Sequence, residues 1–309
     1  MQILEIKNLK KYYKSVKAVD DISFNVEQGD IFAFLGPNGA GKTTTLRILL
    51  DIIKCDSGLI TWRINGKESK LADPTQIGYL PEERGLYTDL PVLRTLVYLG
   101  RIRGMNKVDA NRAAYEWLER LQIADRAREK LQTLSKGNQQ KVQFIASIIH
   151  KPAFAILDEP FSGLDPLNQE LFIEYIQELN RQGCTIILSS HQMQLVEKIA
   201  RKVLLINKGK ALYSGSLADI YKNHQTQHTV ELSLNYNPDN LINSKIEGAE
   251  TIQIGENGKL LITFAHGIEL GRIMGILSGI DGIASISSQQ SNLHNIYLEM
   301  LADRKEILQ

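Results

Sequence analysis

Residues 36–43, Gly-Pro-Asn-Gly-Ala-Gly-Lys-Thr, decide the fold, because they match the pattern GxxxxGK[ST] in full. They follow a continuous apolar run at residues 31–35 and precede a helical pattern that extends through Ile53. Glycines let the backbone curl so that successive N–H groups point at phosphate oxygens, and the N-terminus of the helix adds its positive dipole end. In such a loop the lysine, here Lys42, reaches the β- and γ-phosphates, and the hydroxyl of Thr43 holds Mg²⁺. The sequence therefore predicts a nucleotide-binding loop, made of Gly36, Pro37, Asn38, Gly39, Ala40, Gly41, Lys42, Thr43 and Thr44.

The chain on both sides of this loop has the pattern of an α/β sheet. Residues 31–35, 153–157 and 185–188 are continuous apolar runs, which is typical of parallel strands buried on both faces. Each run leads into polar, turn-forming residues and then a helical stretch. In the first thirty residues apolar and polar side chains alternate, as they do in half-buried strands. From about residue 85 to residue 150 apolar residues recur at helical spacing, so we expect a helical insertion attached to the sheet.

The C-terminal part of the chain has a different pattern. Apolar residues alternate with polar ones at residues 230–234 and 260–264, which indicates two short strands. Helical patterns follow, the last of them at residues 293–300. We therefore predict two domains, a nucleotide-binding domain at residues 1–222 and a small α+β accessory domain at residues 223–309.

Composition and charge narrow the classes of function. The 309 residues include 36 Lys and Arg against 35 Asp and Glu, and a net charge of +1 gives no electrostatic footprint for nucleic acid. The longest unbroken apolar runs have five residues, whereas a helix that spans a bilayer needs about 20. The first residues show no signal-peptide pattern, and Cys55 and Cys184 have no metal-ligand or CxxC spacing. We therefore expect a chain that does not cross a membrane by itself, in a reducing cytosolic setting.

Two adjacent carboxylates end the apolar run at residues 153–157. Asp158 suits the outer coordination sphere of Mg²⁺, and Glu159 is placed to orient and polarise an attacking water molecule. Because side chains alternate along a strand, we expect these two acids to point in different directions rather than to form a facing pair.

Leu-Ser-Lys-Gly at residues 134–137 opens the next helical pattern and offers a second anion site through Ser135 and Gly137. A serine before a helix is ordinarily only an N-cap, so the motif alone leaves both interpretations open. Its position 23 residues before Asp158 favours the anion site.

These motifs occur together in one order along the chain. The phosphate loop is followed by Leu-Ser-x-Gly, by Ile-Leu-Asp-Glu-Pro, by Ser-Gly-Leu-Asp at residues 162–165 and by a lone His191 after a strand. In this combination residues 1–221 resemble the ATP-binding subunit of an ABC (ATP-binding cassette) transporter. The nearest resemblance is to stand-alone ATPase subunits of ABC-2-type exporters, whose extra C-terminal domain often ends in a pattern like that of residues 292–298. The resemblance implies a P-loop NTPase fold with a mixed sheet and a helical insertion.

The resemblance also implies how ATP would be bound. Two copies would associate head to tail with two ATP molecules between them, so that Ser135 and Gly137 of one copy bind the γ-phosphate held by Lys42 of the other. Glu159 would be the catalytic carboxylate acting on water, and His191 would contact the γ-phosphate.

Two further residues take roles from the same resemblance. Asp165 would couple the two ATP sites across the interface between copies. Tyr13 matches the position that stacks on adenine, with Tyr12 as the alternative; without the resemblance, Tyr13 is an ordinary aromatic residue on a surface strand.

Three residues depart from the family pattern. Glu82 stands where the family usually has Gln after Gly-Tyr-Leu-Pro; its carboxylate can still coordinate Mg²⁺ or a bridging water, but it adds negative charge beside the phosphates. Lys136 and Asn138 replace the usual Gly and Gln of the signature. We hypothesise that Lys136, if it points at the ATP of the second copy, offsets part of the charge of Glu82; a solvent-facing lysine is the alternative.

The sequence thus favours a cytoplasmic ATPase, peripheral on the inner face of the cell membrane, that powers an ABC transporter of the exporter type. Its expected partners are a membrane-spanning permease subunit and a second copy of itself or a homologous ATPase subunit, but no nucleic acid. The family docks its permease on the segment after Glu82, so we expect Leu86 and Tyr87 to be partly exposed, with burial in the core as the alternative. Two other functions compete: a non-transport ABC-type ATPase acting on the ribosome or nucleic acid, and an ATP-binding regulatory module that barely hydrolyses.

Overall fold

The computed structural model describes residues 1–83, 85–223, 229–237, 241, 246–255, 258–265, 267–289 and 292–306. The chain divides into two compact units, Met1–Leu217 and Ala218–Gln309. All the motifs that indicate nucleotide chemistry lie in the first unit.

A six-stranded sheet forms the centre of the first unit. Its strand order is β10-β9-β3-β8-β7-β6; five neighbouring strands are parallel and β10 is antiparallel to β9. The strands β3, β7 and β8 are buried at every residue, which explains their unbroken apolar sequences. Because they are parallel neighbours, their carboxyl ends meet at one edge of the sheet. The bounds are β3 (Ile31–Leu35), β6 (Ile77–Leu80), β7 (Phe154–Asp158), β8 (Thr185–Ser190), β9 (Lys202–Asn207) and β10 (Lys210–Ser216).

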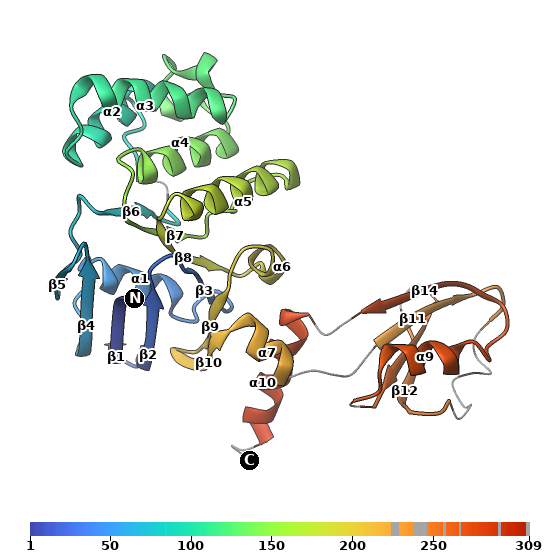
Figure 1. Ribbon diagram of the computed structural model, residues 1–309. Coiled ribbons are helices and arrows are strands. Elements are labelled where there is room, and N and C mark those ends of the chain that lie inside the picture. The colour runs from blue at the N-terminus through green and yellow to red at the C-terminus, as the bar shows by residue number, and fades with distance from the viewer. Residues whose placement is uncertain are drawn as a thin grey trace. The chain divides into compact units, whose positions relative to one another are not determined.

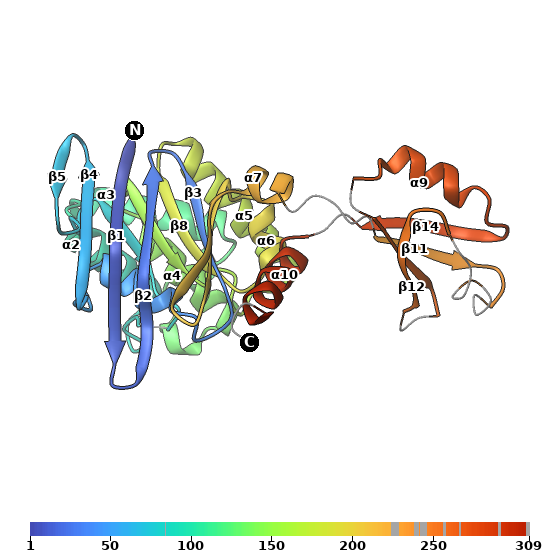
Figure 2. The same cartoon turned by 90° about the horizontal axis from the view of Figure 1, so that it is seen from below.

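A four-stranded antiparallel sheet packs against this central sheet. Its order is β2-β1-β4-β5, and Figure 2 shows the four strands side by side. The strands are β1 (Gln2–Tyr13), β2 (Val16–Glu27), β4 (Ser57–Ile64) and β5 (Lys67–Ser69). One hydrophobic cluster joins the inward residues of this sheet, helix α1 (Lys42–Leu49) and one face of the central sheet. The core therefore holds the helix that begins at Lys42 in a fixed place.

Helices cover the other side of the central sheet, as Figure 1 shows. α4 (Lys136–Ile148), α5 (Pro166–Arg181) and α6 (Met193–Glu197) lie next to the sheet, and α2 (Val92–Ile102) and α3 (Lys107–Arg120) pack on α4. Short 3₁₀ turns at Ala124–Arg126 and Leu131–Thr133 connect α3 with α4. The contact of α4 with β6 is very close, since a Cβ on Gly78 would lie 2.1 Å from the carbonyl oxygen of Ser147. The helical insertion predicted from the sequence thus ends in a helix that is part of the sheet packing.

The second unit begins in α7 (Leu217–Asn223) and contains an antiparallel sheet of order β12-β13-β11-β14. Its strands are β11 (Thr229–Leu234), β12 (Ala249–Ile254), β13 (Leu260–Phe264) and β14 (Ile283–Gln289). Helix α9 (Leu270–Leu277) buries Ile273 and Leu277 against this sheet, and α10 (Leu293–Glu306) ends the described chain. The strands β11 and β13 and both helices were expected from the sequence, whereas β12 and β14 were not.

No helix in the described part of the chain combines the length and the apolar composition that crossing a membrane requires.

Candidate nucleotide-binding site

The loop after β3 can adopt its path only with glycine at particular positions. Gly41 has a φ of 107°, and a Cβ there would lie 2.2 Å from the carbonyl oxygen of Ala18. A Cβ on Gly36 would lie 2.2 Å from the carbonyl oxygen of Ile206. The backbone therefore curls tightly between β2, β9 and the start of α1, and the first N–H groups of α1 are left free of side-chain caps. Free N–H groups at a helix N-terminus form an anion site.

Lys42 is buried at the first position of α1, with 5% of the residue exposed. Its Nζ donates a hydrogen bond of 2.8 Å to the carbonyl oxygen of Gly36 and lies 3.5 Å from Oε1 of Glu159. The ammonium group thus lies inside the curl of the loop, between its backbone and the acid.

Asp158 is fully buried at the end of β7. Ser189 donates a hydrogen bond to its Oδ1, while Oδ2 is buried without a hydrogen-bond partner among the described residues. Burial raises the pKa of Asp158, and the nearby hydroxyls of Ser189 and Thr43 lower it in part. A buried carboxylate with one unpaired oxygen is the kind of group that a nearby cation stabilises in its charged form.

Glu159 follows directly, with a φ of 50° that is uncommon for a residue other than glycine. Only 4% of the residue is exposed, and its Oε2 lies 3.0 Å from Nδ1 of His191, whose own side chain is half exposed. The carboxylate of Glu159 contacts Lys42 and His191, whereas that of Asp158 accepts from Ser189, so the two carboxylates do not form a facing pair. The predicted reason, alternation along a strand, does not apply, because β7 ends at Asp158 and Glu159 has a left-handed backbone.

The residues predicted to hold magnesium lie together. Oγ1 of Thr43 donates to Oε2 of the exposed Glu82 over 3.4 Å, and the same hydroxyl lies near Asp158 and lowers the pKa of that acid. The hydroxyl of Thr43 and the carboxylates of Glu82 and Asp158 offer hard oxygen ligands of the type that Mg²⁺ prefers, and one oxygen of Asp158 has no hydrogen-bond partner among the described residues. The residues present therefore fit a magnesium ion.

The signature residues lie at helix N-termini and bond within their own helices. Ser135 is the exposed N-cap of α4 and accepts a bond from the N–H of Asn138; Gly137 is partly exposed in the first turn. Asp165 is the exposed N-cap of α5, where hydrogen bonds from Asn168 hold its pKa below the ordinary range. The structure thus gathers Lys42, Thr43, Glu82, Asp158, Glu159 and His191, whereas Ser135 and Asp165 bond within α4 and α5 and Gly137 lies in the first turn of α4.

The two candidate tyrosines differ in how freely they can move. The hydroxyl of Tyr12 donates to Asp20 over 2.7 Å, which fixes this ring on the hairpin. Tyr13, at the end of β1, is 44% exposed, and the ammonium of Lys11 lies 5.3 Å from the centre of its ring. Tyr13 is therefore the more accessible ring for stacking.

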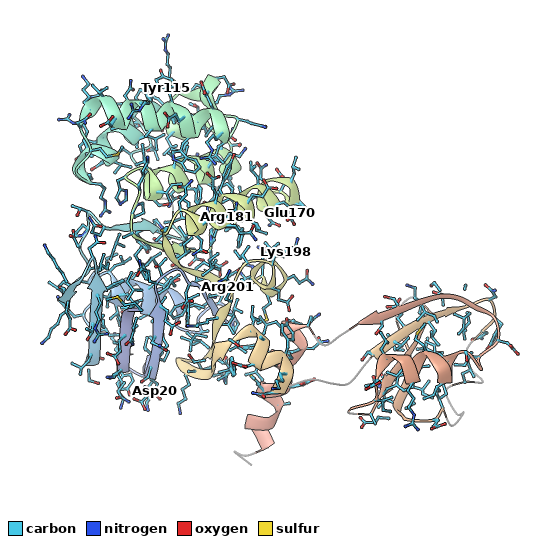
Figure 3. All side chains as sticks on the ribbon, in the orientation of Figure 1. Asp20, Tyr115, Glu170, Arg181, Lys198 and Arg201 are labelled. Atoms are coloured by element: carbon cyan, nitrogen blue, oxygen red, sulfur yellow. The ribbon has the colours of Figure 1, made fainter. Side chains whose placement is uncertain are left out.

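Ser189 is a residue of this site to which no sequence motif points. It lies in β8 opposite Asp158 and bonds to both acids. Its signal in the sequence is weak, because the apolar run ends at Leu188 whereas the strand continues to Ser190. Further along the chain from His191, the ion pair of Lys198 with Glu170 joins the end of α6 to α5; Figure 3 labels both residues.

The chain is similar to known ATP-binding proteins of ABC transporters. A family model described as ABC transporter matches residues 19–162. An uncharacterized ABC transporter ATP-binding protein of Methanocaldococcus jannaschii, MJ1023, is 48% identical over 217 residues, which are 70% of this chain and 79% of that protein. The uncharacterized ABC transporter ATP-binding protein YhaQ of Bacillus subtilis is 37% identical over 297 residues, 96% of this chain and 98% of that protein. SkfA peptide export ATP-binding protein SkfE of Bacillus subtilis is 32% identical over 213 residues, 69% of this chain and 88% of that protein.

Solved structures show the same fold. The ATP-binding subunit of an ABC transporter superposes with a TM-score of 0.65 at 30% identity, over 72% of this chain and 92% of that chain. A dimeric post-hydrolysis state of the ATP-binding cassette MJ0796 bound to ADP and Pi gives a TM-score of 0.64 at 22% identity, over 70% of this chain and 99% of that chain. At this identity the likeness supports the fold alone. The first unit therefore has the P-loop NTPase fold of an ATP-binding cassette, and the chain belongs to the family of ABC transporter ATP-binding proteins.

Proposed function

We propose that this chain binds and hydrolyses ATP to power an ABC transporter, acting as the ATPase subunit beside a separate permease. The observation that carries the proposal is the buried arrangement of Glu159 between Lys42 and His191, at 3.5 Å and 3.0 Å. Because Glu159 is held next to the phosphate-binding Lys42, its carboxylate could accept a proton close to the γ-phosphate.

The reaction follows from the roles of these residues. Free N–H groups of the loop and Lys42 hold the phosphates. Glu159 accepts a proton from a water molecule while the oxygen of that water attacks the γ-phosphorus and the bond to ADP breaks, giving ADP and inorganic phosphate. His191, oriented through its Nδ1 by Glu159, is proposed to contact the γ-phosphate through Nε2.

Thr43, Asp158 and Glu82 are proposed to hold magnesium, Asp158 and Glu82 directly or through water. Magnesium would neutralise phosphate charge during the transfer. The carboxylate of Glu82, in place of the amide that the family usually has, makes this set of ligands more negative.

Two copies, or one copy with a homologous subunit, are proposed to close head to tail around two ATP molecules. Ser135 and Gly137 are exposed enough for a second copy to reach, and the hydroxyl of Ser135 accepts its hydrogen bond within α4, from the N–H of Asn138. Asp165 at the N-terminus of α5 would couple the two sites. Tyr13, with its accessible ring, is proposed to stack on adenine.

The permease is proposed to dock on the surface beside α2. Tyr87 is 58% exposed, Leu86 is partly exposed, and the ring of Tyr87 contacts that of Tyr98 edge to face at 6.2 Å. Ile102 adds to this exposed apolar surface. The predicted exposure of Leu86 and Tyr87 is confirmed, and exposed apolar clusters of this kind are typical of interaction sites. Docking there would hold the chain in the cytoplasm at the inner face of the membrane.

Export is the proposed direction of transport. It is supported by the similarity to SkfE, which is named as a peptide export protein. The domain predicted at residues 223–309, which makes up most of the second unit, is proposed to be an accessory domain that supports or regulates the dimer.

The test is a pull-down of tagged Glu159→Gln from detergent-solubilised membranes with ATP present, beside an equally tagged Lys42→Ala as a matched control. Glu159→Gln should hold ATP in the closed dimer and recover a protein with several apolar helices, and Lys42→Ala should recover less of it. Recovery of ribosomes, nucleic acid or soluble proteins alone would contradict the transport proposal and favour the non-transport ATPase.

A further inference from the structure

Ser189 lies at the centre of the site, yet none of the roles above uses it. In the central sheet β8 runs between β3 and β7, so Ser189 pairs with Phe34 on one side and with Asp158 on the other. The residue is fully buried. It therefore lies between the strand that leads into the phosphate loop and the strand that ends in the two acids.

The hydrogen bonds of Ser189 fix the direction of its hydroxyl proton. The backbone N–H of Glu159 donates to Oγ of Ser189 over 3.0 Å, so one lone pair of this hydroxyl oxygen accepts a hydrogen bond. A serine hydroxyl has one hydrogen to donate. That hydrogen goes to Oδ1 of Asp158. A single hydroxyl thus joins the backbone of one acid to the side chain of the other.

The bond to Asp158 decides which of its oxygens is free. Oδ1 is taken by Ser189, whereas Oδ2 is buried without a hydrogen-bond partner among the described residues. Oδ2 is therefore the oxygen left for a cation or for a water molecule bound to it.

The bond from Glu159 holds an uncommon backbone conformation. Its N–H is shared between Oγ and the carbonyl oxygen of Ser189, at 3.0 Å and 3.2 Å. Glu159 has a φ of 50°, which few residues other than glycine adopt without support. This conformation aims the carboxylate at Lys42 and His191 rather than along the strand.

We propose that Ser189 is a positioning residue that aligns both acids at once, leaving Oδ2 of Asp158 free for the cation and keeping Glu159 in its left-handed conformation. The proposal rests on the proposed function, because it concerns the same ATP and magnesium site. Groups that orient metal-binding side chains from behind change metal affinity or activity by about 10–100-fold when removed.

Four variants test the proposal in the full chain. Ser189→Ala removes the hydroxyl with the smallest change. Ser189→Thr and Ser189→Val have nearly the same shape and differ in the hydroxyl, and both suit a strand. Ser147→Ala is the control, because Ser147 is equally buried but its hydroxyl bonds within α4, to the carbonyl oxygen of Phe144.

Two readouts separate positioning from general stability. The first is the rise in melting temperature on adding ATP, measured with EDTA and then with excess Mg²⁺. The second is the Mg²⁺ concentration that gives half-maximal phosphate release. Ser189→Ala and Ser189→Val should keep the rise in melting temperature that ATP causes in EDTA but lose most of the further rise that Mg²⁺ adds. Their half-maximal phosphate release should require a Mg²⁺ concentration about 10-fold or more higher than in the wild type. Ser189→Thr and Ser147→Ala should resemble the wild type in both.

The proposal is overturned if Mg²⁺ raises the melting temperature of ATP-bound Ser189→Ala as much as that of Ser147→Ala. It is also overturned if Ser189→Thr and Ser189→Val show the same Mg²⁺ dependence in both measurements. Should Ser189→Ala fold too weakly to measure, the Thr and Val pair decides the question. A wild-type chain whose melting temperature does not respond to ATP at all would instead refute the proposed function, which is a different result from loss of the Mg²⁺ increment alone.

Discussion

At the scale of single residues, the site depends on positions where one atom decides the outcome. Gly41 adopts a backbone conformation that other residues rarely have, and the chain passes close beside it. His150 is a titratable ring held largely out of water at the end of α4. Each gives a prediction that needs no knowledge of the transported substrate.

Gly41→Ala should destabilise the first unit by about 3 kcal/mol and abolish ATP binding, because the new Cβ would lie 2.2 Å from the carbonyl oxygen of Ala18 at a φ of 107°. Gly104→Ala is the control: its φ of 98° is similar, but nothing lies within 4 Å of the Cβ. It should cost about 1 kcal/mol and leave ATP binding intact. Urea unfolding followed by fluorescence checks both, and equal losses for the two variants would refute the role of the close contact.

Acid should weaken the first unit through His150. Burial, with the charge of Arg103 in second place, lowers the pKa of this ring to about 4, while Nε2 lies 3.3 Å from the carbonyl oxygen of Ile77. In the unfolded chain an ordinary histidine has a pKa of about 6.5, so it is the unfolded state that takes up the proton first. The stabilisation is complete above pH 6.5 and is lost as pH falls toward 4, by about 2 kcal/mol since part of the ring is solvated.

The check is the pH dependence of the free energy of unfolding for His150→Gln, with His294→Gln as a control at an exposed position. Trp62 and Trp117, the chain's two tryptophans, both lie in the first unit and report its unfolding. His150→Gln should flatten the profile between pH 6.5 and pH 4. An unchanged slope would show that other groups cause the acid sensitivity.

At the scale of elements, the central sheet and the helix behind it are packed without spare room. β6 and α4 approach so closely at Gly78 that no side chain fits there. Ser135 is the N-cap of α4, so the packing of α4 on β6 helps to fix the position of the signature residues.

Gly78→Ala should therefore cost about 2–3 kcal/mol, since its Cβ would lie 2.1 Å from the carbonyl oxygen of Ser147. It should also lower ATPase activity by displacing α4. Gly85→Ala, with nothing within 4 Å of its Cβ, should change neither quantity. If Gly78→Ala were as stable as the wild type, the prediction would be wrong, because α4 could then move away from the sheet with no loss in free energy of unfolding.

The sequence predicts a strand well where one face or both faces of that strand are fully buried. The apolar runs at β3, β7 and β8 and the alternation in β11 and β13 identify those strands. β14 was missed because its sequence, Ile-Ala-Ser-Ile-Ser-Ser-Gln, has no clear alternation and lies at the edge of its sheet. Ser189 was missed for a related reason: a polar residue ends an apolar run in sequence, but here it continues a buried strand because Asp158 and Glu159 satisfy its hydroxyl.

At the scale of the whole molecule, each of the two units has a hydrophobic core of its own. The core of the second unit includes Val230, Leu232, Phe264 and Ile273. All residues proposed to act on ATP belong to the first unit. Separate cores predict separate folding.

A chain ending at Asn223, which keeps α7, should therefore bind ATP within about threefold of the full chain. Binding of a fluorescent ATP analogue to both chains checks this. Lys42→Ala in each chain controls for binding outside the phosphate loop. If the shortened chain folds but no longer binds, the second unit contributes to the site and the proposed division of labour is wrong.

The most direct test of the central claim is phosphate release from Mg-ATP by the wild-type chain and by Glu159→Gln under identical conditions. The proposed chemistry predicts steady turnover by the wild type and a loss of about 100-fold or more in Glu159→Gln, with ATP binding retained. Equal turnover in the two proteins would contradict it, and the chain would then be an ATP-binding regulatory module rather than the motor of a transporter.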